Sequence, residues 1–383
     1  MSAAQWRRAM KSGEATAGRG KYALPPHTGM AVRGAPADSL GTRAAAGWFA
    51  ALQRRIEPRH ILVALFVALF PFIATPFITF QVGAQSLTLG LIALSLGFLA
   101  GYGGMVSLAQ MTVAGIAGYA MAVLGSSSAT EISLGWPWWL AVSFALLIAV
   151  VCSALIGWLS VRTEGIYTIM ITLAIGVAFY YLVLQNYSVF NGFQGLRELK
   201  PPTVLGIGWR EPVPFYFLSL ACALGGYFLV RYVVRAPFGI ALQGIRDNPR
   251  RMGALGYSVV AHRVAAYALS GLLAAVGGIL LAWYNALITP GSVGMSWLIN
   301  ILIIAVLGGV KHPIGAFVGA IVFVLLQTFA IDLIDRERFN LVIGSVFLGI
   351  VLFSPDGLLG VWAKLSLRFG PKQAISSPLR RQL

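Results

Sequence analysis

The chain has few charged residues for its length. Of its 383 residues only 10% are Asp, Glu, Lys or Arg, whereas 58% are hydrophobic and the mean hydropathy is +0.80. A soluble domain carries about 25% charged residues, so this composition excludes one. Acids are the scarcest charged class, with 12 against 28 basic residues. The sequence therefore predicts a polytopic integral membrane protein, embedded in a lipid bilayer.

Further absences exclude several kinds of chemistry. The two cysteines, Cys152 and Cys222, lie in apolar segments, so we expect neither a disulfide framework nor thiol chemistry. The four histidines lack metal-ligand spacing, and the single Gly-Lys pair lacks the pattern of a phosphate-binding loop. We expect no metal and no nucleotide site in this chain. Basic residues stand at the ends of apolar runs, which argues against nucleic acid as a partner.

The two ends of the chain are basic and contain no apolar core. Residues 1–60 are rich in Ala, Gly, Ser and Pro and carry ten Lys or Arg. They predict a disordered cytoplasmic tail rather than a signal peptide or a span, with a misassigned start site as the alternative. Residues 361–383 predict a second basic cytoplasmic tail, and residues 61–360 the transmembrane domain between them.

Ten apolar stretches are predicted to cross the membrane, because about 20 residues of helix span its hydrocarbon core. They lie near Ile61–Gln81, Ser86–Gly103, Val106–Leu124, Trp136–Val161, Gly165–Gln185, Phe215–Val234, His262–Trp283, Ser296–Gly308, Ile314–Ile331 and Leu341–Phe353. The eighth and tenth are short, and either could be a half-helix.

The distribution of basic residues predicts the orientation. With both termini in the cytoplasm, 23 Lys or Arg lie inside and five lie outside, namely Arg197, Lys200, Arg210, Arg336 and Arg338. Cytoplasmic loops carry the excess of Lys and Arg in membrane proteins. The split favours an even number of spans with both termini inside.

No ionisable residue lies well inside a predicted span. Ion-coupled carriers commonly place such residues at membrane depth, so the energy for any transport is expected to come from another protein. A sodium site built from carbonyls and hydroxyls would escape this test, and an ion-coupled secondary transporter remains the alternative class. An intramembrane enzyme would need a nucleophile and base or metal ligands, which the spans lack.

One long polar interruption, Arg235–Ser258, has helical periodicity of its own. An apolar face with spacings of three and four predicts a first short helix, and its members are Phe238, Ala241, Leu242 and Ile245. Asn248 as N-cap and Pro249 at the first helical position predict a second helix, which ends at Gly256. We call these two helices the elbow. The elbow and its flanks contain several arginines and only one acid, Asp247. This excess of positive charge predicts a cytoplasmic location.

The elbow segment A-L-Q-G-I-R-D-N-P-R-R-M-G-A-L-G-Y, which starts at Ala241, resembles the coupling loop of branched-chain amino acid (Liv-type) ABC importer permeases. In that family two short helices insert into a groove on a separate ATPase. The resemblance implies that the ATPase-coupling residues are Phe238, Gly239, Ala241, Leu242, Ile245, Arg246, Asp247, Asn248, Pro249 and Arg250. An ordinary basic loop is the alternative, with Arg246 and Asp247 as an internal pair. Gly253 stands where the family more often has Ala.

Two intramembrane motifs resemble the same family. G-F-L-A-G-Y-G-G-M-V-S-L-A-Q-M-T, from Gly97, contains its G-Y-x-G-x-x-S-L pattern, and the glycines make a helix break near Gly103 and Gly104 inexpensive. R-T-E-G-I-Y-T-I-M-I-T-L-A, from Arg162, contains its R-x-x-G-I-Y pattern. We expect the translocation pathway to be lined by Tyr102, Ser107, Gln110, Thr112, Tyr167 and Thr172. Packing of these polar groups against neighbouring helices is the alternative.

Three further motifs follow in the family's order: N-G-F-Q-G-L from Asn191, L-G-G-V-K-H-P-I-G-A from Leu307 and L-F-S-P-D-G-L-L-G from Leu352. The outer segment Tyr187–Pro214 is a candidate face for an external binding protein, with a plain connecting loop as the alternative.

The resemblance covers residues 62–360 and implies an all-α permease subunit of an ATP-driven importer, which is not itself an enzyme. It implies four kinds of partner: a second permease, two ATP-binding subunits that hold ATP-Mg, and a periplasmic or lipid-anchored substrate-binding protein. This chain would bind no cofactor and would lie in the bacterial inner membrane. Branched-chain or other hydrophobic amino acids are the implied substrates, with urea and short amides as alternatives.

Overall fold

The structure is a computed structural model that describes residues 58–129, 131–163, 165–199, 201–204 and 206–333, together with parts of 344–360. Residues 1–57 of the first predicted tail, the second predicted tail and most of the tenth predicted span, Leu341–Phe353, lie outside the described residues. The chain divides into two units, Met1–Ala64 and Leu65–Leu383, and the account below concerns the second.

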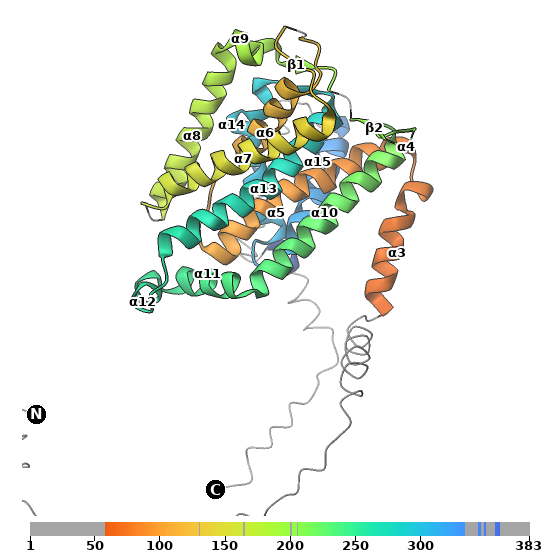
Figure 1. Cartoon of the computed structure of the whole chain (residues 1–383). Helices are drawn as coiled ribbons and strands as arrows, with labels where there is room; N and C mark the ends of the chain where they lie inside the picture. Colours follow the sequence, from red (N-terminus) through yellow and green to blue (C-terminus); the bar gives the residue numbers. More distant parts are fainter. Residues whose placement is uncertain are drawn as a thin grey trace, which may run out of the picture. The chain divides into compact units, whose positions relative to one another are not determined.

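All long elements are helices (Figure 1). They are α3 (Pro58–Ile73), α5 (Gln85–Gly103), α6 (Gln110–Leu124), α7 (Trp138–Ser160), α8 (Ile166–Gln185), α10 (Pro212–Arg235), α11 (Pro237–Asp247), α13 (Val259–Asn285), α14 (Met295–Gly308) and α15 (Pro313–Leu333). The short elements are α4 (Pro76–Ile78), the π-helix η2 (Thr79–Ala84), α9 (Tyr187–Phe190), η3 (Gly192–Gln194), β1 (Leu196–Arg197), β2 (Thr203–Val204), β3 (Ile207–Gly208), α12 (Pro249–Ala254), β4 (Leu287–Ile288) and η4 (Pro290–Val293). The strands form two antiparallel pairs, β1 with β4 and β2 with β3.

Among the described residues, five helices are long and apolar enough to cross a membrane. They are Pro76–Gly103, Trp138–Ser160, Ile166–Gln185, Pro212–Arg235 and Val259–Asn285. The pair α14 and α15 is bent by 117° and forms a broken span or a re-entrant loop, and α6 is a shorter apolar helix. The predicted all-α polytopic membrane class is thus confirmed, whereas the count of ten separate spans stays a prediction.

The boundary between the first two predicted spans was misplaced. The sequence predicted a span to Gln81 and a new one from Ser86, but α3 ends at Ile73 and the next helix runs without interruption from Pro76 to Gly103. The break falls where Pro76 lacks an amide hydrogen and forces Thr75 into extended backbone. Hydropathy does not register this break because both sides are equally apolar.

The turn between α14 and α15 depends on glycine. Gly309 has φ of 103°, a backbone conformation that side chains rarely adopt, and Pro313 starts the next helix. A Cβ atom on Gly308 would collide with the carbonyl oxygen of Gly315, and one on Gly319 with that of Ile304. These glycines therefore let the two helices approach backbone to backbone across the sharp bend.

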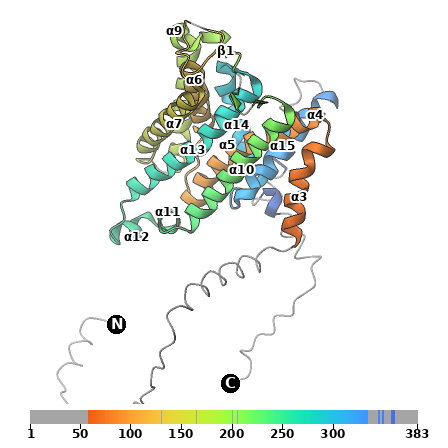
Figure 2. The ribbon, with the colours of Figure 1, turned by 45° about the vertical axis from the view of Figure 1, so that its right-hand side comes forward.

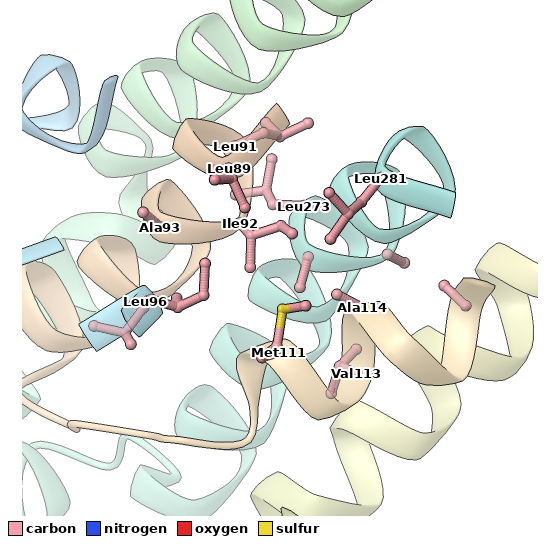
Figure 3. Close-up of a cluster of buried hydrophobic side chains, with 14 of the residues drawn as sticks. Leu89, Leu91, Ile92, Ala93, Leu96, Met111, Val113, Ala114, Leu273 and Leu281 are labelled. Atoms are coloured by element: carbon pink, nitrogen blue, oxygen red, sulfur yellow. The ribbon is translucent and has the colours of Figure 1, made fainter. Parts of the chain in front are cut away.

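The central layer consists of α5 and α13, which pack against each other and against α6, α7 and α15 (Figures 1 and 2). The most apolar 18-residue stretch of Pro76–Gly103 is 83% buried, whereas that of α8 is 22% buried, so α8 lies at the periphery. Figure 3 shows Leu89 and Ile92 of α5 beside Met111 of α6 and Leu273 of α13.

Small and hydroxyl residues join these helices, as expected where lipid gives no hydrophobic drive for association. The Ser270 hydroxyl on α13 donates to the Ser95 carbonyl on α5 at 2.8 Å. The Ser153 hydroxyl on α7 donates to the Tyr267 carbonyl on α13 at 2.7 Å. The helices are therefore fixed in register by polar contacts as well as by shape.

Candidate functional site

The elbow forms as the sequence predicts. Its helices, α11 and α12, both begin with proline, and the Asn248 side chain accepts a hydrogen bond from the Arg251 amide at 2.9 Å. Asn248 is thus the N-cap of α12, and Gly256 follows that helix with φ of 89°. Figures 1 and 2 show the elbow at one end of the helices, which we call the elbow end, and β1 with α9 at the other, the loop end.

The predicted apolar face of α11 is turned toward its own chain. Gly239, Ala241, Leu242 and Ile245 are buried, and the Phe238 ring stacks on His262 with centroids 5.7 Å apart. A Cβ atom on Gly239 would collide with the Val233 carbonyl, so the close turn from α10 requires glycine there. These five residues therefore hold the elbow in place, and their role in coupling to an ATPase stays a prediction.

The elbow also has exposed apolar side chains, which we call its outward face and which the periodicity of the sequence did not predict. Ile240 is 64% exposed, Leu255 67% and Tyr257 44%, and all three lie off the buried stripe. Arg235, Arg250 and Arg251, which are near them in the sequence, are also exposed. The sequence signal was that these apolar residues are out of phase with the helix period. Exposed apolar side chains can mark a surface that docks on another protein.

Arg246 joins the elbow to the central helix. Its Nη1 donates to the Gly101 carbonyl at 2.6 Å, near the C-terminal end of α5, while its Nε and Nη2 each lie 2.9 Å from Asp247 Oδ1. The stem of Arg246 crosses Gly104, where a Cβ atom would lie 2.5 Å from Arg246 Cγ. The pair with Asp247 matches the alternative raised from the sequence, and the bond to Gly101 adds a contact that sequence alone could not reveal.

The central helix breaks next to this contact. α5 ends at Gly103, Gly104 takes the left-handed conformation with φ of 66°, and α6 begins at Gln110. A break at this glycine pair was predicted, but the third predicted span was wrong to start at Val106. Side chains pair with backbone amides of the non-helical segment between the two helices. Thr172 Oγ1 accepts from the Leu108 amide at 3.1 Å, and Ser107 Oγ accepts from the Ala109 amide at 3.3 Å. Non-helical backbone within a membrane protein needs such partners.

The structure gathers four of the six predicted pathway residues around this break. Ser107, Thr112 and Thr172 are 0% exposed and Gln110 is 1% exposed. Gln110 Oε1 accepts from the Ser95 hydroxyl at 3.2 Å, whereas Gln110 Nε2 and Thr112 Oγ1 have no hydrogen-bond partner among the described residues. The other two lie apart: Tyr102 is half-buried near Lys311, and Tyr167 is 66% exposed on the outside of α8.

The loop end contains a wide hollow of about 650 Å³. Asn191, Phe193, Gln194 and Arg197 line it, together with Thr289 next to strand β4. The Asn191 side chain donates to the Gly195 carbonyl at 2.8 Å and so fixes the loop, while β1 pairs with β4 across almost ninety residues. The predicted face for an external protein thus coincides with a structured concave surface.

The family comparison places this polytopic helical protein, with its basic elbow fastened to a broken central helix, in the class of membrane transport permeases. The family model for the permease component of the branched-chain amino acid transport system matches residues 78–353, and the chain belongs to this family. It is a permease subunit of an ABC importer and a multi-pass protein of the bacterial inner membrane.

Curated relatives agree on the class and differ in cargo. The chain is 24% identical to the high-affinity branched-chain amino acid permease LivM of Escherichia coli, over 79% of this chain and 75% of the relative. It is 21% identical to the ribose import permease RbsC of Haemophilus influenzae, over 63% and 76%. It is 26% identical to the nucleoside permease NupC of Lactococcus lactis, over 60% and 74%. No solved structure matches the chain significantly.

Proposed function

We propose that this chain forms half of the translocation pathway of an importer for branched-chain or other hydrophobic amino acids, and couples that pathway to a separate ATPase. The observation that carries the proposal is the bond from Arg246 to Gly101. It connects the elbow to α5 within three residues of the point where the helix breaks. A movement of the elbow would therefore be transmitted to the backbone beside Ser107 and Gln110.

In this mechanism the outward face of the elbow docks on the ATPase, and the buried face keeps α11 attached to α10 and α13. ATP binding draws the two ATPase subunits together, the elbow follows, and Arg246 pulls on the end of α5. The segment 104–109 is held by side-chain hydrogen bonds rather than by helix, so it deforms more easily than α5 or α6. Opening there would bring the unpaired Nε2 of Gln110 and the Thr112 hydroxyl into contact with the solute.

The elbow end is proposed to face the cytoplasm, with both termini on that side and an even number of spans. Arg162, in the turn after α7, and Lys311, in the turn after α14, lie at the same end as the elbow arginines. Arg197 and Arg210 lie at the opposite end. This grouping agrees with the positive-inside rule.

The proposed partners follow from the same orientation. A second permease subunit completes the pathway, two ATP-binding subunits bind ATP-Mg and dock on the two elbows, and this chain holds no cofactor. A periplasmic or lipid-anchored binding protein delivers the solute to the hollow around Asn191 and Gln194 at the loop end.

Branched-chain amino acids are the preferred cargo because the LivM permease of Escherichia coli, matched over 79% of this chain and 75% of its own length, is named for them. Ribose and nucleoside permeases among the relatives show that this architecture also accommodates polar solutes. Urea and short amides in the same importer class are the alternative cargo. An ion-coupled secondary transporter is the alternative class.

The test is uptake of radiolabelled leucine into vesicles that contain this chain with its ATPase, permease and binding-protein partners. We expect uptake that requires both ATP and the binding protein. Uptake that persists without ATP and collapses with the ion gradient would establish a secondary transporter instead. If leucine is not taken up in either condition, urea and acetamide are the next solutes to measure.

A further inference from the structure

Helix α7, which lies beside α13 in Figure 1, has two faces of opposite composition. Residues at every fourth position are small and buried where α7 packs on α6 and α13, namely Ala141, Ala145, Ala149, Ser153 and Gly157. Large apolar side chains with exposed fractions between 36% and 59% occupy the opposite face, namely Phe144, Leu147, Ile148, Val151, Leu155, Trp158 and Leu159. We call this second set the α7 outer face.

The α7 outer face lacks the features of a helix contact in a membrane. Such contacts are enriched in small residues, which let two backbones approach closely, and in polar groups that bond across the interface. Ser143 is the only residue with a hydroxyl or a charge exposed along α7, all of which the structure describes. Its hydroxyl donates to the Trp139 carbonyl in the preceding turn at 2.7 Å, so the proton is used within the helix. Large branched side chains suit fluid acyl chains, which adapt to any apolar shape.

The tryptophans of α7 mark two levels that are separated by the thickness of a bilayer. Trp138 and Trp139 lie exposed at its loop end, and Trp158 lies exposed at its elbow end. The helix is 23 residues long, and about 30 Å of its axis separates Trp138 from Trp158. This length equals the hydrocarbon thickness of a typical bilayer, and tryptophan is enriched where that layer meets water on either side.

Arg162 indicates the same boundary at the elbow end. Its guanidinium lies 4.6 Å from the centre of the Trp158 ring, in the turn that follows α7. An arginine beside a tryptophan is expected where a helix leaves the hydrocarbon, because the stem and the ring stay in an apolar layer while the charge reaches water. Both ends of the α7 outer face therefore carry the side chains typical of a membrane interface.

We propose that the α7 outer face contacts the acyl chains of membrane phospholipids over its whole length, between boundaries at Trp138 and Trp158, and that the second permease packs on a different face of this chain. Composition and length carry this assignment together. A protein partner would explain an apolar face, but it would not explain why the apolar stretch ends in tryptophan at both sides after about 30 Å. The assignment does not depend on which solute the importer carries.

The test identifies the medium around single nitroxide labels on this face, in the assembled importer in nanodiscs. Both natural cysteines are replaced with alanine, and labels are attached in Ile148→Cys, Val151→Cys or Leu159→Cys. Oxygen collects in hydrocarbon whereas a nickel chelate stays in water, so the ratio of their collision rates with a label reports its depth. We expect oxygen to dominate at all three positions, with the highest ratio at Ile148, midway along the face.

Phe193→Cys is the control, because Phe193 is 75% exposed at the loop-end hollow and its label should collide mainly with nickel. A label at Val151 that neither reagent reaches would place a protein on this face. A label there that nickel reaches would place a water-filled pathway on it. Either result overturns the proposal, and so does a maximum that lies more than about one helical turn from Ile148.

Truncation of the α7 outer face distinguishes lipid from a protein partner without any label. Leu147 and Leu155 are each 59% exposed. If a helix of the second permease packed on them, Leu147→Ala or Leu155→Ala would leave a cavity and weaken the association by at least about tenfold. Acyl chains fill such a space, so we expect the second permease to bind both variants with unchanged affinity. A tenfold loss in either variant overturns the assignment.

The outcome is separable from that of the proposed function. If vesicles take up no leucine but the labels report hydrocarbon, the proposed cargo falls and the α7 outer face stays assigned to lipid. If leucine is taken up with ATP and the labels report protein or water, the importer stands and this assignment falls.

Discussion

Arg246 donates a hydrogen bond to the carbonyl oxygen of Gly101 at 2.6 Å, from a position 145 residues further along the chain. The acceptor is one of the carbonyls near the end of α5, where intrahelical partners run out. The donor lies in the last turn of α11, which is otherwise attached by apolar packing. A single side chain thus links the element proposed to dock on the ATPase with the helix that breaks at the proposed pathway.

Replacing Arg246 with Gln should uncouple transport from ATP hydrolysis. A hydrogen bond to a charged group contributes about 1.5–3 kcal/mol, so we expect ATP-driven uptake to fall roughly tenfold. Binding of the ATPase should be retained, because the guanidinium is turned toward α5 and Asp247. The measurement compares uptake and ATP hydrolysis in the same proteoliposomes.

Arg231→Gln is the matched control for this prediction, since Arg231 is an exposed arginine near the end of α10 whose Nη1 donates a long hydrogen bond to the Tyr227 hydroxyl at 3.4 Å. It should transport normally. Asp247→Asn should have a small effect, because exposed ion pairs contribute about 0–1 kcal/mol. Loss of ATPase binding in Arg246→Gln, with coupling intact in the complex that remains, would make Arg246 a docking residue instead.

The elbow shows how much the sequence could predict. Asn248, Pro249 and Gly256 set the two ends of α12 through local backbone chemistry, and each of those positions was predicted correctly. Which face of α11 points inward was inferred less well, because the apolar stripe was assigned to an external partner. An isolated helix does not reveal whether its apolar face meets its own chain or another, and only the packing of α10, α5 and α13 decides this.

The ends and bends of the membrane spans were less predictable from the sequence than those of the elbow. Helices that are apolar on all sides carry no periodicity, so their number and length were predictable only from hydropathy. The break at Thr75 and Pro76 and the 117° bend after Gly308 depend on backbone conformation at single residues. Pairs such as Gln110 and Ser95 join residues from separate helices. The sequence could identify a polar residue such as Gln110 as a candidate, but it could not predict which residue pairs with it.

Replacing Leu255 with Ser should weaken binding of the ATPase. Leu255 is 67% exposed beside Tyr257 on the outward face of the elbow, and burial of a leucine side chain contributes about 1.5–3 kcal/mol. We expect at least about tenfold weaker binding of the purified ATPase to the permease in nanodiscs. Leu134→Ser is the control, since Leu134 is 57% exposed in the loop between α6 and α7, at the loop end. Equal loss in both variants would assign the effect to general damage rather than docking.

Gln110→Leu separates a pathway role from a packing role. The Nε2 atom of Gln110 is buried without a partner, so leucine of similar size should leave stability unchanged or raise it. If the amide contacts the solute during transport, uptake should fall while the unfolding temperature holds. Ser95→Ala, which removes the donor to Gln110 Oε1 at 3.2 Å, should give a smaller fall in uptake. Normal uptake by Gln110→Leu at normal expression would remove this residue from the pathway.

Glycine substitutions test the packing that positions the pathway. A Cβ atom on Gly278 of α13 would collide with the Ala114 backbone of α6, so Gly278→Ala must push α13 away from α6, the helix that begins after the break. Overpacking of this kind costs about 1–3 kcal/mol, and we expect a lower unfolding temperature in detergent together with reduced uptake. Gly225→Ala on α10 is the matched change, because nothing lies within 4 Å of the added carbon. Removing a helical glycine there should stabilise the protein by up to about 1 kcal/mol. If Gly278→Ala unfolds at the same temperature as Gly225→Ala, the close contact between α6 and α13 is not what holds the break in place.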